Sequence, residues 1–171
     1  SRGLGDVYKR QPTAGSSGTI PGVLFKLEKT HDLTEDQMVD FLFTSALFGR
    51  VVANNASVAG ATGGCQAEVG SASAMAAAAS VAIFKGTPEQ SGHAMALAIS
   101  NLLGLVCDPV AGLVEIPCVM RNAIGSGNAL ISADLALAGV ESRIPVDEVI
   151  GAMDRAVSYT HLRAHETRGN L

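Results

Sequence analysis

Two stretches of the chain share one pattern, a capping signal followed by apolar residues at helical spacing. After Thr34-Glu-Asp-Gln37, which has the form of a capping box, apolar or small residues follow at positions 38, 41, 42, 45, 48 and 52. After Thr87-Pro-Glu-Gln90 the apolar residues run from Met95 to Leu103, and Gly104 closes the pattern. The spacing predicts two amphipathic helices.

A third stretch, Gln66 to Lys85, carries Ala and Ser on nearly all sides, which predicts a central, buried helix. Gly63 and Gly64 break the chain before it, and Gly86 is expected to end it. Strand-like alternation is scarce. Three further helices are predicted at Gly22 to Lys29, at about Cys118 to Ala138 with a stop at Gly139, and at Pro145 to Ala156. We therefore expect an all-α chain, a compact helical domain whose small residues let the helices pack closely.

The two ends of the chain read unlike its middle. Residues 157–167 (VSYTHLRAHET) can be encoded by a DNA sequence whose reverse complement encodes residues 1–10, the start of the first flank, residues 1–11 (SRGLGDVYKRQ). One sequencing-library adapter translated from opposite strands has this property, so residues 1–11 and 157–171 are expected to be non-native flanks. The native part is then residues 12–156, expected to be one domain and a fragment of a longer gene.

The charge of the middle part excludes one class of partner. Residues 12–156 hold seven basic and fourteen acidic residues, so the net charge of −4 for the whole chain becomes −7 for this part. Nucleic-acid binding is therefore not expected. The most apolar stretch, Val69 to Phe84, is shorter than the roughly 20 residues that span a bilayer, and charged residues flank it. We expect no membrane insertion and a cytoplasmic location, since no export signal is visible.

Two segments are rich in turn-forming residues. Residues 12–21 (PTAGSSGTIP) lead into a predicted helix and form either an anion site built from backbone N–H groups or a plain loop. Residues 106–118 (VCDPVAGLVEIPC) contain two prolines and a glycine between two cysteines, so no regular helix fits there. The second segment is expected to be an ordered loop that holds two thiols in place.

The three cysteines, Cys65, Cys107 and Cys118, are an odd number, which argues against a disulfide framework. Cys65 precedes one predicted helix and Cys118 begins another. The partial positive charge of a helix N-terminus favours the thiolate, the form that ligates metals. No spacing matches the Cys-x-x-Cys of zinc or ferredoxin-like sites. Spacing alone leaves metal ligands and buried packing residues as open alternatives.

Longer blocks of sequence surround these cysteines. They are residues 55–72 (NASVAGATGGCQAEVGSA) and 104–118 (GLVCDPVAGLVEIPC), accompanied by the small-residue segment 12–21 and by residues 143–153 (RIPVDEVIGAM). Together they resemble the alpha chain, or alpha domain, of iron-sulfur-dependent L-serine dehydratases. The resemblance covers essentially all of residues 12–156 and has all three cysteines in register.

The resemblance implies that Cys65, Cys107 and Cys118 ligate a 4Fe-4S cluster and leave one iron without a protein ligand. Such an iron acts as a Lewis acid on the hydroxyl of L-serine, so that dehydration and deamination yield pyruvate and ammonia without pyridoxal phosphate. The chain is then expected to be part of a carbon-nitrogen lyase of amino-acid catabolism. Enzymes of this family also have a beta chain or beta domain, to which nothing in this sequence corresponds. The expected partners are L-serine and that beta part, in an oligomer, and we expect no activity without the beta part.

Other polar residues receive weaker assignments. Thr13, Ser16 and Ser17 are expected to contact the substrate carboxylate, with a helix cap as the alternative. No general base is assigned, because His31 and His93 fit surface or packing histidines better. Glu68, Asp108 and Glu115 are expected to fix the loop by hydrogen bonds rather than transfer protons. Asn55 and Asn122 are expected to hold backbone rather than substrate.

Two alternative functions remain at this stage. One is a related cluster-dependent lyase that removes sulfide from cysteine, and relative turnover of serine, threonine and cysteine distinguishes it. The other is a non-catalytic helical subunit whose cysteines only pack. That subunit would stay colourless after anaerobic treatment with iron and sulfide.

Overall fold

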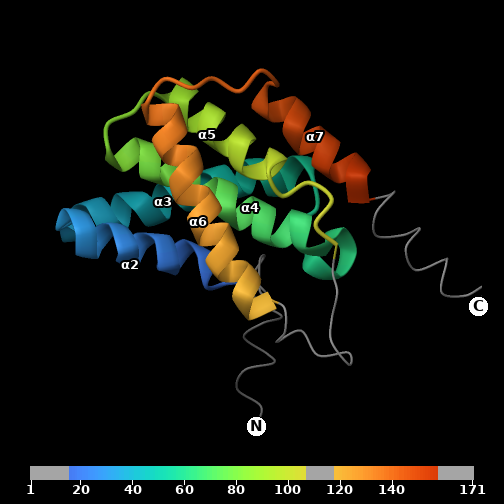
Figure 1. The fold of residues 1–171 in the computed structure, drawn as a ribbon, viewed down its shortest axis with the longest axis horizontal. Helices are drawn as coiled ribbons and strands as arrows, with labels where there is room; N and C mark the ends of the chain where they lie inside the picture. The colour runs from blue at the N-terminus through green and yellow to red at the C-terminus, as the bar shows by residue number, and fades with distance from the viewer. Residues whose placement is uncertain (1–15, 107–117, 158–171) are drawn as a thin grey trace, which may run out of the picture.

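The computed structural model describes residues 16–106 and 118–157, and these form six helices and no strand (Figure 1). The helices are α2 (Thr19–His31), α3 (Glu35–Asn55), α4 (Gly60–Ile83), α5 (Pro88–Ser100), α6 (Cys118–Leu137) and α7 (Val146–Val157). The all-α prediction is confirmed for this part of the chain. Four of the residues singled out above lie outside the described residues: Thr13, Cys107, Asp108 and Glu115.

Helix α4 runs through the middle of the bundle and contacts each of the other five helices (Figure 1). Its alanines are fully buried at positions 72, 74, 76, 77, 78 and 79. The prediction of a central, buried helix from its Ala and Ser content is therefore confirmed. Within the described ranges, no helix combines the length and hydropathy that a bilayer crossing requires.

Glycines allow α3 and α6 to approach α4 closely. A Cβ atom on Gly49 of α3 would lie 2.5 Å from Cε of Met75, and one on Gly125 of α6 would lie 2.7 Å from Cγ1 of Val69. Carbon atoms do not pack at such distances. A larger residue at Gly49 would have to displace the flexible end of Met75, whereas one at Gly125 would press against the short, branched side chain of Val69. The close packing expected from the small residues is present at these two crossings.

Both predicted capping boxes are present. The Thr34 hydroxyl accepts a hydrogen bond from the Gln37 N–H (3.3 Å), and Gln37 Oε1 accepts one from the Thr34 N–H (3.0 Å). The same pair of bonds joins Thr87 and Gln90, at 3.2 and 2.9 Å. These reciprocal bonds satisfy backbone donors that a helix start would otherwise leave without partners, and so fix where α3 and α5 begin.

Loss of one cap has a measurable cost. Thr87→Ala removes the hydroxyl that accepts the Gln90 N–H, and we expect the free energy of unfolding to fall by about 1 kcal/mol. Thr30→Ala is the control, because the Thr30 hydroxyl donates to the Lys26 carbonyl within α2 and caps no helix start. Urea unfolding followed by circular dichroism measures both variants. Equal losses in the two would show that the cap contributes nothing of its own.

The first helix begins earlier than predicted, at Thr19 rather than Gly22. The Gly18 N–H and the Thr19 hydroxyl both donate to Oδ1 of Asn122, each at 3.1 Å, so a side chain from α6 satisfies donors at this helix start. Pro21 falls in the first turn, where a missing N–H costs no intrahelical bond. The local sequence contains no sign of a partner 104 residues away.

Three helix details also differ from the prediction. Lys85, with a φ of 63°, takes the left-handed position after α4 that the sequence had suggested for Gly86. The Gly86 N–H then donates to the Val81 carbonyl at 2.9 Å, which closes the helix end. Helix α5 ends at Ser100, and turns lead from there to Gly104, whose φ is 83°. Leu42, part of the apolar pattern of α3, is 49% exposed.

Candidate functional site

A sharp break in α4 places Cys65 at a helix start. Gly64 has a φ of 72° and a ψ of −176°, which divides α4 into a first turn and a long helix that begins at Cys65. This backbone conformation is essentially restricted to glycine, because a Cβ atom would clash with the neighbouring peptide groups. The predicted chain break before the central helix is confirmed, although the turn Gly60–Gly63 before it is helical as well.

Two of the three cysteines are described, and both are buried. Cys65 is 2% exposed and packs against Val69 and Leu102, while Cys118 is 8% exposed and is the first residue of α6. Neither forms a disulfide bond. The starts of α2, α4 and α6 lie at the same edge of the bundle (Figure 1). Hydrogen bonds from Ser16 and Gly18 to α4 and α6 tie these helix starts together.

Arg121 links the two cysteine-bearing helices. It lies three residues after Cys118, on the same side of α6, and its Nη1 donates to the Sγ of Cys65 at 3.0 Å. The same nitrogen donates to the carbonyl of Val106 at 2.7 Å. Arg121 was not among the residues predicted from the sequence, although a basic residue one helical turn after a cysteine is a signal that could have indicated it.

Gln66 holds the chain that leads to Cys107. The buried side chain of Gln66 accepts a hydrogen bond from the Gly104 N–H through Oε1 at 2.8 Å. The backbone N–H of Gln66 donates to the Leu105 carbonyl, also at 2.8 Å. Together with the Arg121 bond to Val106, these contacts fasten residues 104–106 against the starts of α4 and α6. Val106 immediately precedes Cys107, which lies outside the described residues. Gln66 was not predicted from the sequence either, because nothing near it in the sequence distinguishes it from an ordinary helix residue.

Residues 16–21, the described part of the small-residue segment, lie against the same helix starts. Ser16 is 1% exposed and its hydroxyl donates to the Glu68 carbonyl at 3.0 Å, whereas the neighbouring Ser17 is exposed. Gly18 and Thr19 donate to Asn122, as described above. The substrate-contact roles of Ser16 and Ser17, and of Thr13, stay predictions. What these bonds show is that the segment is held beside the cysteine helices.

Asn122 fixes backbone, as its sequence context favoured. Besides accepting from α2, it donates through Nδ2 to the Cys118 carbonyl at 2.9 Å. Asn55, by contrast, makes a local bond from Nδ2 to the Val51 carbonyl at 2.7 Å and is exposed. Glu68 is half-buried, and its Oε2 lies so close to Gly60 that a Cβ atom there would overlap it. Glu68 therefore folds back over the first turn of α4.

Asn122 offers a direct test of how firmly these helix starts are joined. Asn122→Ala removes bonds to Gly18, Thr19 and Cys118, and we expect the free energy of unfolding to fall by about 2 kcal/mol. Asn55→Ala, which loses one exposed local bond, is the matched control with an expected change below about 0.5 kcal/mol. Denaturant unfolding measures both. A loss for Asn122→Ala as small as that of the control would contradict a structural role for this residue.

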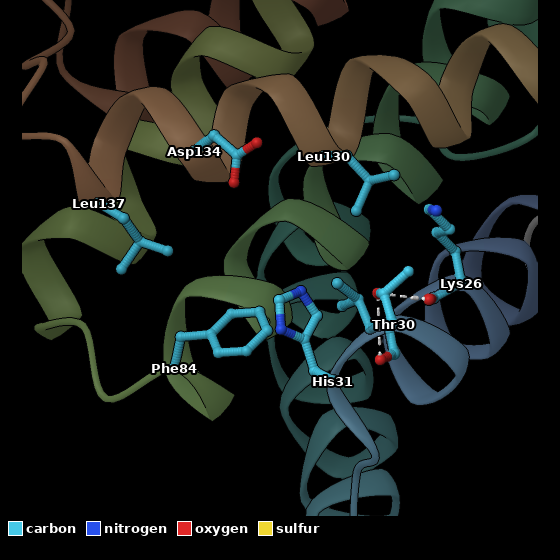
Figure 2. Close-up of a pocket in the computed structure, with 8 residues that line it drawn as sticks. Lys26, Thr30, His31, Phe84, Leu130, Asp134 and Leu137 are labelled. Carbon is cyan, nitrogen blue, oxygen red and sulfur yellow. Dashed lines mark hydrogen bonds between the residues drawn. The ribbon is translucent and has the colours of Figure 1, made fainter.

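The two histidines lie elsewhere. His31 and Phe84 meet edge to face, with ring centroids 4.8 Å apart, at a pocket of about 480 Å³ formed by α2, α6 and the end of α4 (Figure 2). Lys26 and Asp134 lie on other walls of this pocket, which no cysteine lines. His93 accepts the Ser142 N–H through Nδ1 at 3.2 Å. Both histidines therefore make packing contacts, which is the role their sequence context favoured.

The described residues contain no group of three His, Cys, Asp or Glu side chains placed to hold a metal ion. Cys107 lies outside these residues. The donor chemistry at the helix starts nevertheless fits a thiophilic metal centre. Two thiols outside any disulfide begin adjacent helices, and the chain is held there up to the residue before the third.

Comparison with known proteins identifies the family. The family model described as serine dehydratase alpha chain matches residues 8–170. The chain belongs to this family. A probable L-serine dehydratase alpha chain of Bacillus subtilis (strain 168) is 66% identical over 142 residues, which cover 83% of this chain and 47% of the relative. The corresponding protein of Latilactobacillus sakei is also 66% identical over 142 residues, which cover 83% of this chain and 68% of that relative.

A third relative, the L-serine dehydratase alpha chain of Peptoniphilus asaccharolyticus, is 56% identical over 142 residues, or 83% of this chain and 49% of that protein. The chain thus spans about half the length of the Bacillus and Peptoniphilus relatives. The family resemblance inferred from the cysteine blocks is confirmed.

Proposed function

We propose that this chain is the alpha part of an enzyme that converts L-serine to pyruvate and ammonia, with a 4Fe-4S cluster on Cys65, Cys107 and Cys118. The names of its relatives support the substrate. One observation supports the cluster more than any other. Cys65 and Cys118 are buried at two adjacent helix starts, and Arg121 connects Cys65 to the residue before Cys107.

The chain's own residues prepare this site in two ways. Both described thiols are buried, Cys65 beside Val69 and Leu102, which keeps water from them. Each thiol also stands at a helix start, where the partial positive charge of the helix favours a thiolate. Gln66 and Arg121 hold Gly104 and Val106, the residues that lead to the third cysteine. When bound, the cluster supplies the Lewis acid that assists departure of the serine hydroxyl.

The proposal includes a second component. Neither histidine of the described residues lies at the cysteine site, and the Glu68 side chain folds over Gly60 in the first turn of α4. We therefore place the base that removes the α-proton on the beta chain or beta domain, which completes the site. The assembled enzyme is an oligomer of alpha and beta parts in the cytoplasm.

Comparative turnover tests this function. The chain is combined with its beta part, loaded anaerobically with iron and sulfide, and supplied in turn with L-serine, L-threonine and L-cysteine. We expect pyruvate from L-serine at the highest kcat/KM, and loss of that activity when iron is removed. Faster release of sulfide from L-cysteine, or serine turnover that survives complete removal of iron, would contradict the proposal.

A further inference from the structure

A substrate such as L-serine carries a carboxylate, and a cation is the strongest partner that a protein offers it. Seven basic residues lie within residues 12–156, and the structure describes all of them. Six lie on α2, α3 or α7, in the turn after α4 or in the loop before α7: Lys26, Lys29, Arg50, Lys85, Arg143 and Arg155. Among these seven, Arg121 alone hydrogen-bonds a cysteine.

The guanidinium of Arg121 is held by one nitrogen only. Nη1 donates to Cys65 Sγ and to the Val106 carbonyl, whereas no acceptor among the described residues contacts Nε or Nη2. These two nitrogens form one edge of the planar guanidinium, and that edge matches the spacing of two carboxylate oxygens. The side chain is half-buried, so its orientation is restrained while one edge remains available to a ligand.

Four other donors of the described residues near the cysteine helices are already engaged. The single hydroxyl proton of Ser16 goes to the Glu68 carbonyl, and the Gly18 N–H and Thr19 hydroxyl both go to Asn122. The side-chain Nδ2 of Asn122 in turn donates to the Cys118 carbonyl. A carboxylate that enters this region therefore finds its charged partner in Arg121.

We propose that Arg121 binds the carboxylate of the amino-acid substrate through Nε and Nη2, while Nη1 remains on Cys65 and Val106. This inference rests on the proposed function, because it takes the substrate to be an amino acid bound beside Cys65. Its consequence is geometric: one side chain fixes the distance between the substrate carboxylate and a cluster ligand. Arg121 then selects for α-amino acids over amines and amides of similar size.

The test uses the assembled, cluster-loaded enzyme and two ligands that cannot lose water, L-alanine and L-alaninamide. The amide replaces the carboxylate by a neutral group of similar shape. Calorimetry measures both affinities for the wild type, Arg121→Gln, Arg121→Lys and the matched control Arg50→Gln, which removes an exposed arginine of α3. Iron and sulfide analysis of each sample, together with KM and kcat for L-serine, accompanies the titrations.

We expect Arg121→Gln to weaken L-alanine binding by about 10- to 100-fold and to change L-alaninamide binding by less than about threefold. Arg121→Lys keeps the charge but lacks the two-nitrogen edge, so its affinity for L-alanine should lie between those of the wild type and Arg121→Gln. Arg50→Gln should bind both ligands as the wild type does. If Arg121→Gln does not load the cluster, Arg121→Lys provides the comparison, with the same selective loss. KM for L-serine should rise more than kcat falls.

Equal weakening of both ligands would overturn this inference and leave Arg121 as a structural link only, and unchanged affinity for both ligands would also overturn it. Failure of the proposed function gives a different result. In that case the wild type itself would bind no iron or would not convert L-serine, whatever residue occupies position 121.

Discussion

Cys65→Ser is expected to lower L-serine turnover by about 100-fold or more and to leave the assembled enzyme without a stable cluster. A serine hydroxyl stays protonated at neutral pH and is a hard oxygen ligand, whereas iron-sulfur clusters bind through soft thiolates. The buried position of Cys65, against Val69 and Leu102, leaves no room for another side chain to take its place. Pyruvate formation and the iron content of the same sample measure the effect.

The control for this experiment separates cluster loss from unfolding. Cys65→Ala removes the ligand without burying a hydroxyl, so it should lose the cluster as completely as Cys65→Ser does while retaining more stability. Circular dichroism and urea unfolding of the metal-free proteins provide the comparison. Full activity and iron content in either variant would exclude Cys65 as a ligand and return it to a packing role.

Gly64→Ala is expected to lower the free energy of unfolding by about 2–3 kcal/mol and to reduce cluster loading. The reason is the backbone at Gly64, where a φ of 72° with a ψ of −176° places any Cβ atom in a clash. The strain is relieved by a shift of the chain at the position where Cys65 begins its helix. The same substitution therefore affects both stability and the position of a cluster ligand.

Gly127→Ala is the matched control for Gly64→Ala. Gly127 lies in α6, and a Cβ atom there would meet nothing within 4 Å, so alanine should leave stability unchanged or raise it by up to about 1 kcal/mol. Denaturant unfolding of both variants and iron analysis after anaerobic loading give the two readouts. A Gly64→Ala protein as stable and as well loaded as the control would show that the break in α4 does not position Cys65.

Local signals in the sequence were enough to predict most of the helices. The capping boxes at Thr34 and Thr87 act within four residues, and both are present with the expected bonds. The Ala-rich pattern of α4 reports its surroundings directly, because only a helix enclosed on all sides tolerates so little polar surface. These features depend on neighbours in sequence, which is why they could be read without a structure.

The start of α2 was predicted wrongly because it depends on a contact between distant segments. Helix α2 begins at Thr19 because Asn122 of α6 satisfies its first donors, and nothing near residue 19 indicates that bond. Lys85 takes a left-handed conformation that propensity assigns to the adjacent Gly86. Once the chain folds, Gly86 is confined by Val81 and Leu137 instead.

The candidate site divides in the same way. The cysteines could be predicted as ligands because the sequence blocks around them resemble those of a known family. Their spacing alone left a role as buried packing residues as an equal alternative. Arg121 and Gln66 were not predicted, because their hydrogen-bond partners are distant in sequence. Arg121 bonds to Cys65 and Val106. Gln66 bonds to Gly104. The structure adds the contact through which Arg121 links the helices of Cys65 and Cys118, and no single sequence motif indicates that contact.

The central claim is that the three cysteines share one iron-sulfur cluster, and anaerobic reconstitution tests it most directly. The purified protein is incubated with iron and sulfide without oxygen, and iron, sulfide and the visible spectrum are measured for the wild type and for Cys118→Ser. We predict a brown wild-type protein with about four irons and four sulfides per chain. It should show a broad visible band that bleaches in air and changes when L-serine is added, and Cys118→Ser should show no stable band. A colourless wild-type protein without iron, or a Cys118→Ser protein that binds the same cluster, would contradict the claim.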